Sequence, residues 1–202
     1  IIWLKHSFKI DLKSFGLVVL VALALIFYNK YYYLGTKFGT ASLGGAMVTT
    51  MIPILTFILL ALMGVKKVSS KDLFALGLGA VGVLTMLHIW TFDVEHILVI
   101  HNLYFFLAAI LWAVLTIISS KSTKISPIVF TFYMYIITVA LDWLFFVDVS
   151  AIPFETFDGI FWINTILISL AASTFSNTIY FLGIEKLGAA EVSSFVFLVP
   201  FS

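Results

Sequence analysis

The 202-residue chain contains no cysteine and no arginine, and only 10% of its residues are charged. Without cysteine the chain can form no disulfide and no thiolate metal site, and it has no cysteine nucleophile. Its net charge of +1 at pH 7 provides no basic surface of the kind that binds nucleic acid, so we expect no nucleic-acid partner. These absences exclude whole classes of protein before any motif is considered.

Apolar side chains are what the chain has in excess. Hydrophobic residues make up 62% of it and aromatic residues 17%, and its mean hydropathy is +1.17. A soluble domain of this length exposes too large a share of its chain to keep such a composition away from water, so we expect its surroundings to be the lipid bilayer. The chain begins and ends inside apolar stretches, which predicts a fragment of a longer membrane protein.

Seven apolar runs are long enough, or nearly so, to cross a membrane as helices, which need roughly 20 residues for ~30 Å of hydrocarbon. The runs lack the alternation of barrel strands, so helices are expected. Two runs carry start signals: "SSKD" at 69–72 has the spacing of a capping box, and Ser126-Pro127 is typical of an N-cap followed by proline. The runs are residues 14–34, 40–63, 72–89, 102–119, 126–147, 159–182 and a last one from 188.

The distribution of lysine predicts the orientation of the chain. Nine of the eleven lysines lie before the first run or in the connections after the second, fourth and sixth runs. Because cytoplasmic loops of membrane proteins carry an excess of lysine and arginine, the lysine-rich side is expected to face the cytoplasm. The connections on the other side are acidic, with Asp93, Glu95, Asp148, Glu155 and Asp158.

One short stretch occurs twice, at a constant offset of 148 residues. "ALIFYNKYYYLG" at 24–35 and "ASTFSNTIYFLG" at 172–183 share six of twelve residues, whereas about one match is expected by chance in so biased a composition. The two copies lie in the first and sixth runs and therefore cross the membrane in opposite directions. An inverted repeat is the architecture of many secondary transporters, whose substrate site lies near the midplane between the halves.

Four stretches, taken in order, resemble the drug/metabolite transporter superfamily, specifically the EamA-type exporters. They are "YYYLGTKFGTASLGGAMVTTMIPILTFILL", "KKVSSKDLFALGLGAVGVLTML", "LAAILWAVLTIISSKSTKISP" and "YFLGIEKLGAAEVSSFVFLVPF". The resemblance covers essentially the whole chain, from the end of helix 2 of the family to the middle of its helix 9. In one place the chain departs from the family: "MGVKKVSSKD" lacks the acidic residue of the usual Gly-Glu pair, which weakens the case for a gating salt bridge there.

The resemblance implies an all-α polytopic membrane protein, an inverted-repeat helical bundle with 5+5 helices in the intact family and about seven spans here. Residues 1–95 would form the first EamA repeat, with helices 3–5, and residues 96–202 the second, with helices 6–9. The implied function is secondary transport of a small metabolite, an amino acid or related compound, by alternating access. Export is the implied direction, the bacterial cytoplasmic (inner) membrane is the implied location, and no cofactor or metal is implied.

Polar residues inside the apolar runs are the candidates for substrate binding. In the sixth run they recur every three or four residues, which predicts one polar stripe on a helix. The stripe would face a water-accessible cavity, or else join neighbouring helices through hydrogen bonds of about 0.6 kcal/mol each. Lys30 would bind a substrate carboxylate or phosphate if it faced the cavity, or extend its long side chain to the interface. The candidates are Asn29, Lys30, Tyr32, Ser173, Asn177 and Tyr180.

Pro53 and Pro200 each follow one copy of the repeat. They are candidate hinges for alternating access, although prolines are also tolerated in membrane helices without a mechanical role. A further face of small residues at 77–82 would serve an internal contact or the seam of a homodimer. Small residues near the prolines would let the two proline-containing helices approach closely; they are Gly44, Gly45, Ser193 and Ser194.

Other classes of function fit the sequence less well. An intramembrane enzyme would need a nucleophile with its base, or clustered metal ligands, at depth, and all four histidines fall in loops or at the ends of runs. We therefore expect no enzymatic activity. A passive channel lined by asparagine and serine is a closer alternative, although no ring of repeated charge supports it. A fragment that does not transport by itself is the third alternative.

Overall fold

The structure is a computed structural model of the chain, and it describes residues 8–86, 89–91, 100–122 and 124–201. Within these residues the regular structure is entirely helical, as the apolar runs predict. Two of the acidic residues used for orientation, Asp93 and Glu95, lie outside the described residues. The predicted boundary between the two repeats, at residues 95 and 96, lies outside them as well.

The helical segments follow the predicted runs, but the fifth, sixth and last runs are divided into several segments. The α-helices are α1 (Leu12–Phe38), α2 (Ala41–Leu62), α3 (Ser70–Met86), α5 (Leu103–Ser119), α6 (Pro127–Leu141), α7 (Gly159–Leu167), α8 (Ser176–Leu187) and α9 (Ala189–Ser194). Two π-helical segments are η3 (Asp142–Phe146), after α6, and η6 (Ile168–Phe175), between α7 and α8. The 3₁₀ segments are η1 (Ile89–Thr91), η2 (Ile100–Asn102), η4 (Val149–Ala151), η5 (Phe154–Thr156) and η7 (Phe195–Phe201).

Five helical stretches of the described chain are long and apolar enough to cross a membrane. Helix α3 has 17 residues, and Ala189–Val199 forms a shorter apolar helix. The predicted all-α polytopic membrane protein is therefore confirmed. The five stretches are Leu12–Phe38, Gly44–Leu62, Ile100–Ser119, Pro127–Phe146 and Gly159–Leu187.

Both helix starts predicted from the sequence are confirmed. At the beginning of α3 the Ser69 amide donates to Oδ2 of Asp72 at 2.9 Å, and the Asp72 amide donates to Oγ of Ser69 at 3.2 Å, which is a capping box. At the beginning of α6, Oγ of Ser126 accepts a hydrogen bond from the Val129 amide, and Pro127 follows in the first turn. These side chains satisfy amides that have no partner within their own helix.

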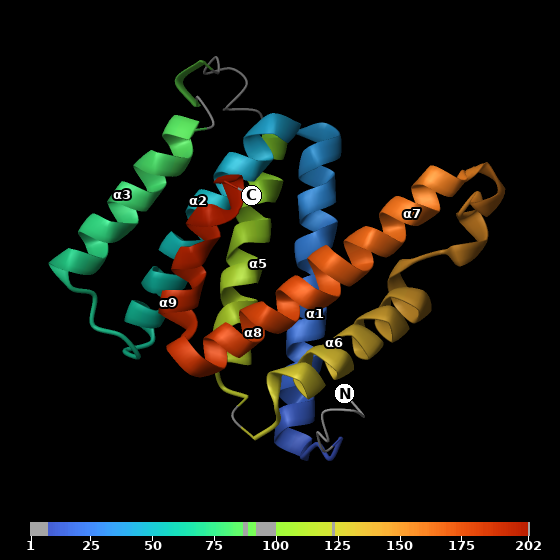
Figure 1. The fold of residues 1–202 in the computed structure, drawn as a ribbon, viewed down its shortest axis with the longest axis horizontal. Coiled ribbons are helices and arrows are strands. Elements are labelled where there is room, and N and C mark those ends of the chain that lie inside the picture. Colours follow the sequence, from blue (N-terminus) through green and yellow to red (C-terminus); the bar gives the residue numbers. More distant parts are fainter. Residues whose placement is uncertain (1–7, 87–88, 92–99, 123, 202) are drawn as a thin grey trace.

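Helix α5 lies at the centre of the bundle, where it packs against α1 and α2 and also contacts α8 and α9 (Figure 1). Helices α6 and α7 lie on one side of this centre, α8 crosses it on the way to α9, and α3 lies on the other side, packed against α2 and η7. The connections α2–α3, α5–α6 and α8–α9 lie at the same end of the bundle as the start of α1 (Figure 1). Most of the lysine-rich segments therefore lie at one end of the bundle. This agrees with the sequence, in which every second connection is rich in lysine.

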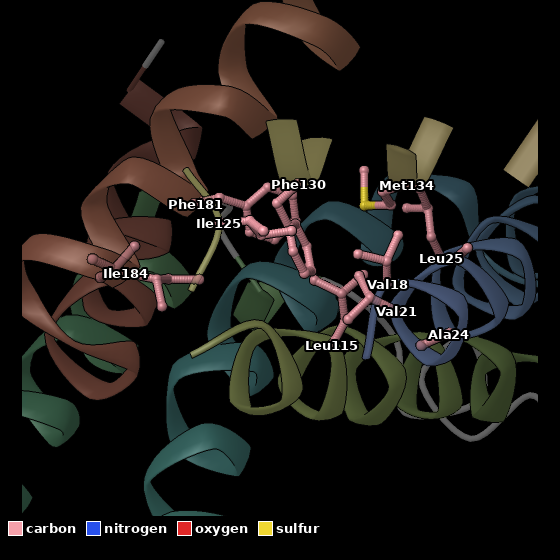
Figure 2. Close-up of a cluster of buried hydrophobic side chains, with 12 residues drawn as sticks. Val18, Val21, Ala24, Leu25, Leu115, Ile125, Phe130, Met134, Phe181 and Ile184 are labelled. Atoms are coloured by element: carbon pink, nitrogen blue, oxygen red, sulfur yellow. The ribbon is translucent and has the colours of Figure 1, made fainter. Parts of the chain in front are cut away.

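A cluster of buried apolar side chains joins α1, α5, α6 and α8 (Figure 2). Val18, Val21 and Leu25 of α1 recur every three or four residues and so share one helix face. Leu115 of α5 and Met134 of α6 are fully buried against them. Because lipid tails are as apolar as these side chains, the cluster stabilises the bundle through close packing rather than through removal from water.

Two glycines allow α1 and α2 to approach α5 at the same point. A Cβ atom at Gly35 would lie 2.6 Å from the ring of Phe105, and a Cβ atom at Gly44 would overlap the same ring. Phe105 is fully buried, so its ring has little space into which it could move. A Cβ atom at Gly45, one residue further along, would meet nothing within 4 Å. The close approach therefore depends on Gly44 and not on its neighbour.

The π-helical segment η6 changes the register of the sixth predicted run. Side chains follow its wider turn: Oγ1 of Thr174 donates to the carbonyl oxygen of Ser169, and Oγ of Ser176 donates to that of Ala171, each five residues earlier. A π-helical turn holds more residues than an α-helical turn, so side chains before and after it do not keep an α-helical spacing. The polar stripe predicted for this run therefore begins in π-helical and ends in α-helical structure.

Candidate functional site

A cavity of about 340 Å³ lies where α1, α2, α5, α8 and η7 meet. It takes walls from both predicted halves of the chain, since α1 and α2 precede residue 95 and the other elements follow it. Its lining includes aliphatic residues of α2 and η7. The aromatic and polar side chains that line it are Tyr28, Tyr32, Thr49, Trp112, Ser176, Asn177 and Tyr180.

Aromatic rings form a continuous wall along one side of the cavity. The ring centroids of Tyr28 and Trp112 are 4.7 Å apart, and those of Trp112 and Tyr180 are 5.6 Å apart. The Tyr28 ring also stacks on that of Tyr32, with centroids 6.0 Å apart. Aromatic contacts of this kind contribute about 0.5–1.5 kcal/mol each beyond the area that they bury. The rings therefore help to hold α1 against α5 and α8.

Hydrogen bonds fix two polar side chains of the cavity. Nδ2 of Asn177 donates to the hydroxyl oxygen of Tyr135, on α6, at 2.6 Å. The hydroxyl oxygen of Tyr180 lies 2.9 Å from Oγ1 of Thr116. Thr116 gives its single hydroxyl hydrogen to the carbonyl oxygen of Trp112 at 2.8 Å, so Tyr180 is the donor in the bond with Thr116.

The structure brings three of the six predicted substrate-binding residues to the cavity. Tyr32, Asn177 and Tyr180 are among the residues that line it. Ser173 is half-buried in η6 and is not among them; its side chain contacts the hydroxyl of Tyr135, which also accepts the hydrogen bond from Asn177. Ser173 and Asn177 thus both face α6, and of the two only Asn177 also lines the cavity.

Asn29 and Lys30 lie outside the cavity. Both side chains are exposed on α1, next to Tyr28, which lines the cavity. Successive residues of an α-helix are turned by about 100°, so position 29 points away from the face that Tyr28 shares with Tyr32. The repeat thus places its two tyrosines, Tyr32 and Tyr180, at the cavity, but not both of its asparagines. The exposed position of Lys30 agrees with the alternative that its side chain extends to the interface.

Tyr28 and Trp112 are wall residues that the sequence reasoning did not select. Tyr28 lies one helical turn before Tyr32, so the period of α1 could have found it. Trp112 lies within the apolar helix α5, where no local signal separates a cavity-lining tryptophan from one that packs between helices. Its Nε1–H group is buried beside the hydroxyl of Tyr180.

A larger groove, of about 720 Å³, lies between α6 and the η6–α8 segment. Its lining is mostly apolar, with Phe132 and Trp143 among the large side chains, and all of it comes from the predicted second half. Tyr135 lines this groove and accepts the hydrogen bond from Asn177, which lines the cavity. The groove has the character of a lipid-facing surface, whereas the cavity between the two halves combines polar and aromatic groups.

The two predicted hinges occupy different kinds of helix. Pro53 is fully buried inside α2, and the helix continues through it to Leu62. Pro200 lies in the 3₁₀ segment η7. Pro53 has no N–H group for the carbonyl oxygen of Thr49, four residues earlier, and Thr49 lines the cavity. A hinge motion at either proline stays a prediction.

The four predicted packing residues lie where α2 meets its neighbours and in α9. Gly44 packs on α5, whereas Gly45 lines the cavity. Ser193 is fully buried and Ser194 is half-buried, and both hydroxyls donate to the carbonyl oxygen of Ala190. Because both serines use their hydrogens within α9, they present small surfaces rather than hydrogen-bond donors to the neighbouring helices. Helix α2 does pack against α9 and η7.

An ion pair joins the α2–α3 connection to the beginning of α9. Nζ of Lys66 lies 2.8 Å from Oε1 of Glu191 and 4.0 Å from Oδ1 of Asp72, and it also lies over the ring of Phe57, 4.5 Å from its centroid. Lys66 belongs to the segment "MGVKKVSSKD", in which the missing acidic residue weakened the case for a salt bridge. The connection supplies the cation, and a residue 125 positions later supplies the anion.

Histidine and acidic side chains do not gather at the cavity. Among the described residues, no group of three or more such side chains lies close enough together to hold a metal ion. His101 lies in η2, just before the first residue of α5, and its ring is beside those of Phe38 and Tyr104. The remaining histidines, His6, His88 and His96, lie outside the described residues.

Comparison with known proteins gives one family and one curated relative. The model of the EamA-like transporter family matches residues 99–202, which is just over half of the chain. A WAT1-related protein of Arabidopsis thaliana is 39% identical over 65 residues, which are 32% of this chain and 17% of that protein. The matched segment thus spans less than a fifth of the length of this relative. No solved structure matches the chain significantly.

Proposed function

Because the chain belongs to the EamA-like transporter family, we propose that it moves a small metabolite across the membrane by alternating access around the cavity between α1, α2, α5, α8 and η7. The family and the apolar helices identify an integral membrane transporter of the drug/metabolite type. The proposed substrate is an amino acid or a related compound, and the proposed direction is export. The proposed location is a bacterial inner membrane.

The observation that carries this proposal is the composition of the cavity wall. Polar side chains inside membrane-crossing helices are costly, and they are retained where they face a cavity or one another. Asn177 and Thr49 lie on helices from different halves and line the same cavity. Movement of one half against the other would therefore open this wall first to one side of the membrane and then to the other.

Thiol labelling tests the proposal, because the chain has no cysteine of its own. We expect the variant Gly45→Cys to react with a membrane-impermeant thiol reagent applied from either face, in right-side-out and in inverted vesicles of the full-length protein. Gly45 lines the cavity, and a Cβ atom there meets nothing within 4 Å, so the substitution should be tolerated. Mass shift of the labelled protein measures the reaction.

Gly82→Cys provides the matched control. Gly82 is an exposed glycine of α3 where a Cβ atom would also meet nothing within 4 Å, but it does not line the cavity. We expect it to stay unlabelled, because a thiol in lipid does not form the reactive thiolate. Labelling of Gly45→Cys from one face only would rule out alternating access around this cavity. Simultaneous and undiminished access from both faces would indicate a channel instead.

A further inference from the structure

The contact between α2 and the α9–η7 segment ends, at the lysine-rich end of the bundle, in a pocket of about 300 Å³. Phe57 of α2 and Asp72 of α3 line one side of this pocket, and Glu191 of α9 and Phe197 of η7 line the other. The two sides therefore come from different predicted halves of the chain. Among the described residues that line the pocket, Lys66 is the one cation, and it lies between two carboxylates.

Lys66 has one partner across this contact and a second on its own side. Its Nζ lies 2.8 Å from Oε1 of Glu191, in the second half, and 4.0 Å from Oδ1 of Asp72, six residues further along its own half. Lysine carries its charge and three N–H donors on a flexible stem, so a shift of Nζ by about 1 Å would bring Asp72 within hydrogen-bond distance.

Both carboxylates are held by their own helices. Oδ2 of Asp72 accepts hydrogen bonds from the amide and the hydroxyl of Ser69, at 2.9 and 2.8 Å, so that Oδ1 is left for Lys66. Glu191 lies in the first turn of α9, where a helix favours a negative charge. Its Oε2 lies against Gly188, which has a φ of +99° and where a Cβ atom would be 2.9 Å away. Lys66 is therefore the member of the cluster that can move.

The two carboxylates have opposite effects on the separation of α9 from the α2–α3 connection. Separation breaks the pair of Lys66 with Glu191, so Glu191 favours the closed contact. Lys66 would then remain over the ring of Phe57, and Asp72 would be its nearby partner. Separation also moves Glu191 away from Asp72, and like charges repel. Asp72 therefore favours the open arrangement on both counts.

We propose that Lys66 is a two-position switch, which binds Glu191 while the lysine-rich side of the cavity is closed and transfers to Asp72 when that side opens. The transfer keeps the lysine paired in both arrangements, so that the ion pair guides the contact without holding it shut. This inference rests on the proposed function, because it takes α9 and the α2–α3 connection to move apart during alternating access.

Two neutralising substitutions with opposite effects test the switch. Each is made in the full-length Gly45→Cys protein, and the rate of labelling by a membrane-impermeant thiol reagent is measured from the lysine-rich face. We expect Asp72→Asn to slow labelling about threefold and Glu191→Gln to speed it about threefold, factors set by the small contribution of exposed ion pairs. A fixed salt bridge of Lys66 with Glu191 alone would leave the rate unchanged in Asp72→Asn.

Two further variants assign the effect of Asp72→Asn to its pairing with Lys66. Lys66→Met removes the charge and keeps an apolar stem beside Phe57, so adding Asp72→Asn to it should have little further effect. Ser69→Ala removes the hydroxyl of the capping box but leaves the carboxylate of Asp72 in place, so it should not slow labelling. Equal slowing in Ser69→Ala would assign the effect to the start of α3 and overturn the switch.

The outcomes separate this inference from the proposed function. Labelling of the parent Gly45→Cys protein from both faces, with an unchanged or faster rate in Asp72→Asn, would overturn the switch and leave the transport cavity in place. Slowing by Asp72→Asn that persists undiminished in the Lys66→Met background would also overturn it. Labelling of the parent from one face only would remove the proposed function and the switch together.

Discussion

Replacing Gly44 with alanine is expected to destabilise the bundle by about 1–3 kcal/mol, although alanine is the better helix former. The added methyl group would overlap the ring of Phe105, which is fully buried on α5. The ring cannot retreat toward α1, because Gly35 of α1 already lies against the same edge of the ring. We expect the variant to unfold at a lower temperature in detergent, followed through tryptophan fluorescence, and to yield less monodisperse protein.

The next glycine supplies a matched control for this prediction. Gly45→Ala adds the same methyl group where nothing lies within 4 Å, so it should be neutral or slightly stabilising. The smaller side chain of Phe105→Leu should partly rescue Gly44→Ala, because it removes the edge with which the methyl group collides. Equal thermal stability of the two alanine variants would show that α2 does not approach α5 as closely as described.

Reversing the charge of Lys66 is expected to loosen the lysine-rich end of the bundle. In Lys66→Glu the new carboxylate would face those of Glu191 and Asp72, so attraction between the α2–α3 connection and α9 becomes repulsion. The side chains of Lys66 and Glu191 are 24% and 52% exposed, so water screens the change to about 1 kcal/mol. This corresponds to about a fivefold faster labelling of Gly45→Cys from the lysine-rich face.

Restoring the pair distinguishes this contact from a general effect of charge. Adding Glu191→Lys to Lys66→Glu places opposite charges at the same two positions and should return labelling most of the way to its original rate. Lys67→Glu makes the same change at the neighbouring, exposed residue and should have little effect. A similar increase in Lys67→Glu would mean that net charge, and not the pair with Glu191, governs access. High salt should weaken the effect, since exposed charges are screened.

The helices of the fold could be predicted from the sequence because their causes are local. Continuous apolar runs define α1, α2 and α5 to within a few residues, and the capping box at Ser69 and Asp72 places the start of α3. The π-helical segments η3 and η6 could not be predicted in this way. Apolar composition fits α- and π-helical turns equally well, and the difference arises from packing against other helices.

The cavity could be predicted only in part, because it depends on which faces of separate helices meet. Internal repetition singled out Tyr32, Asn177 and Tyr180, which line it. The same repetition singled out Asn29, which is exposed, since similarity between two helices does not ensure similar neighbours for each. The ion pair of Lys66 and Glu191 could not be predicted from the sequence. The two residues are 125 positions apart, and local spacing carries no sign of such a contact.

The combined length of α7, η6 and α8 bears on the membrane itself. Gly159–Leu187 is an unbroken helical stretch of 29 residues, about 40 Å long at roughly 1.5 Å per residue, whereas the hydrocarbon core measures ~30 Å. Such a stretch fits by tilting, and it lies obliquely to α1 and α5 in Figure 1. A thinner bilayer would increase the tilt and a thicker one would reduce it. The position of Asn177 and Tyr180 along the membrane normal would therefore follow the acyl-chain length of the surrounding lipid.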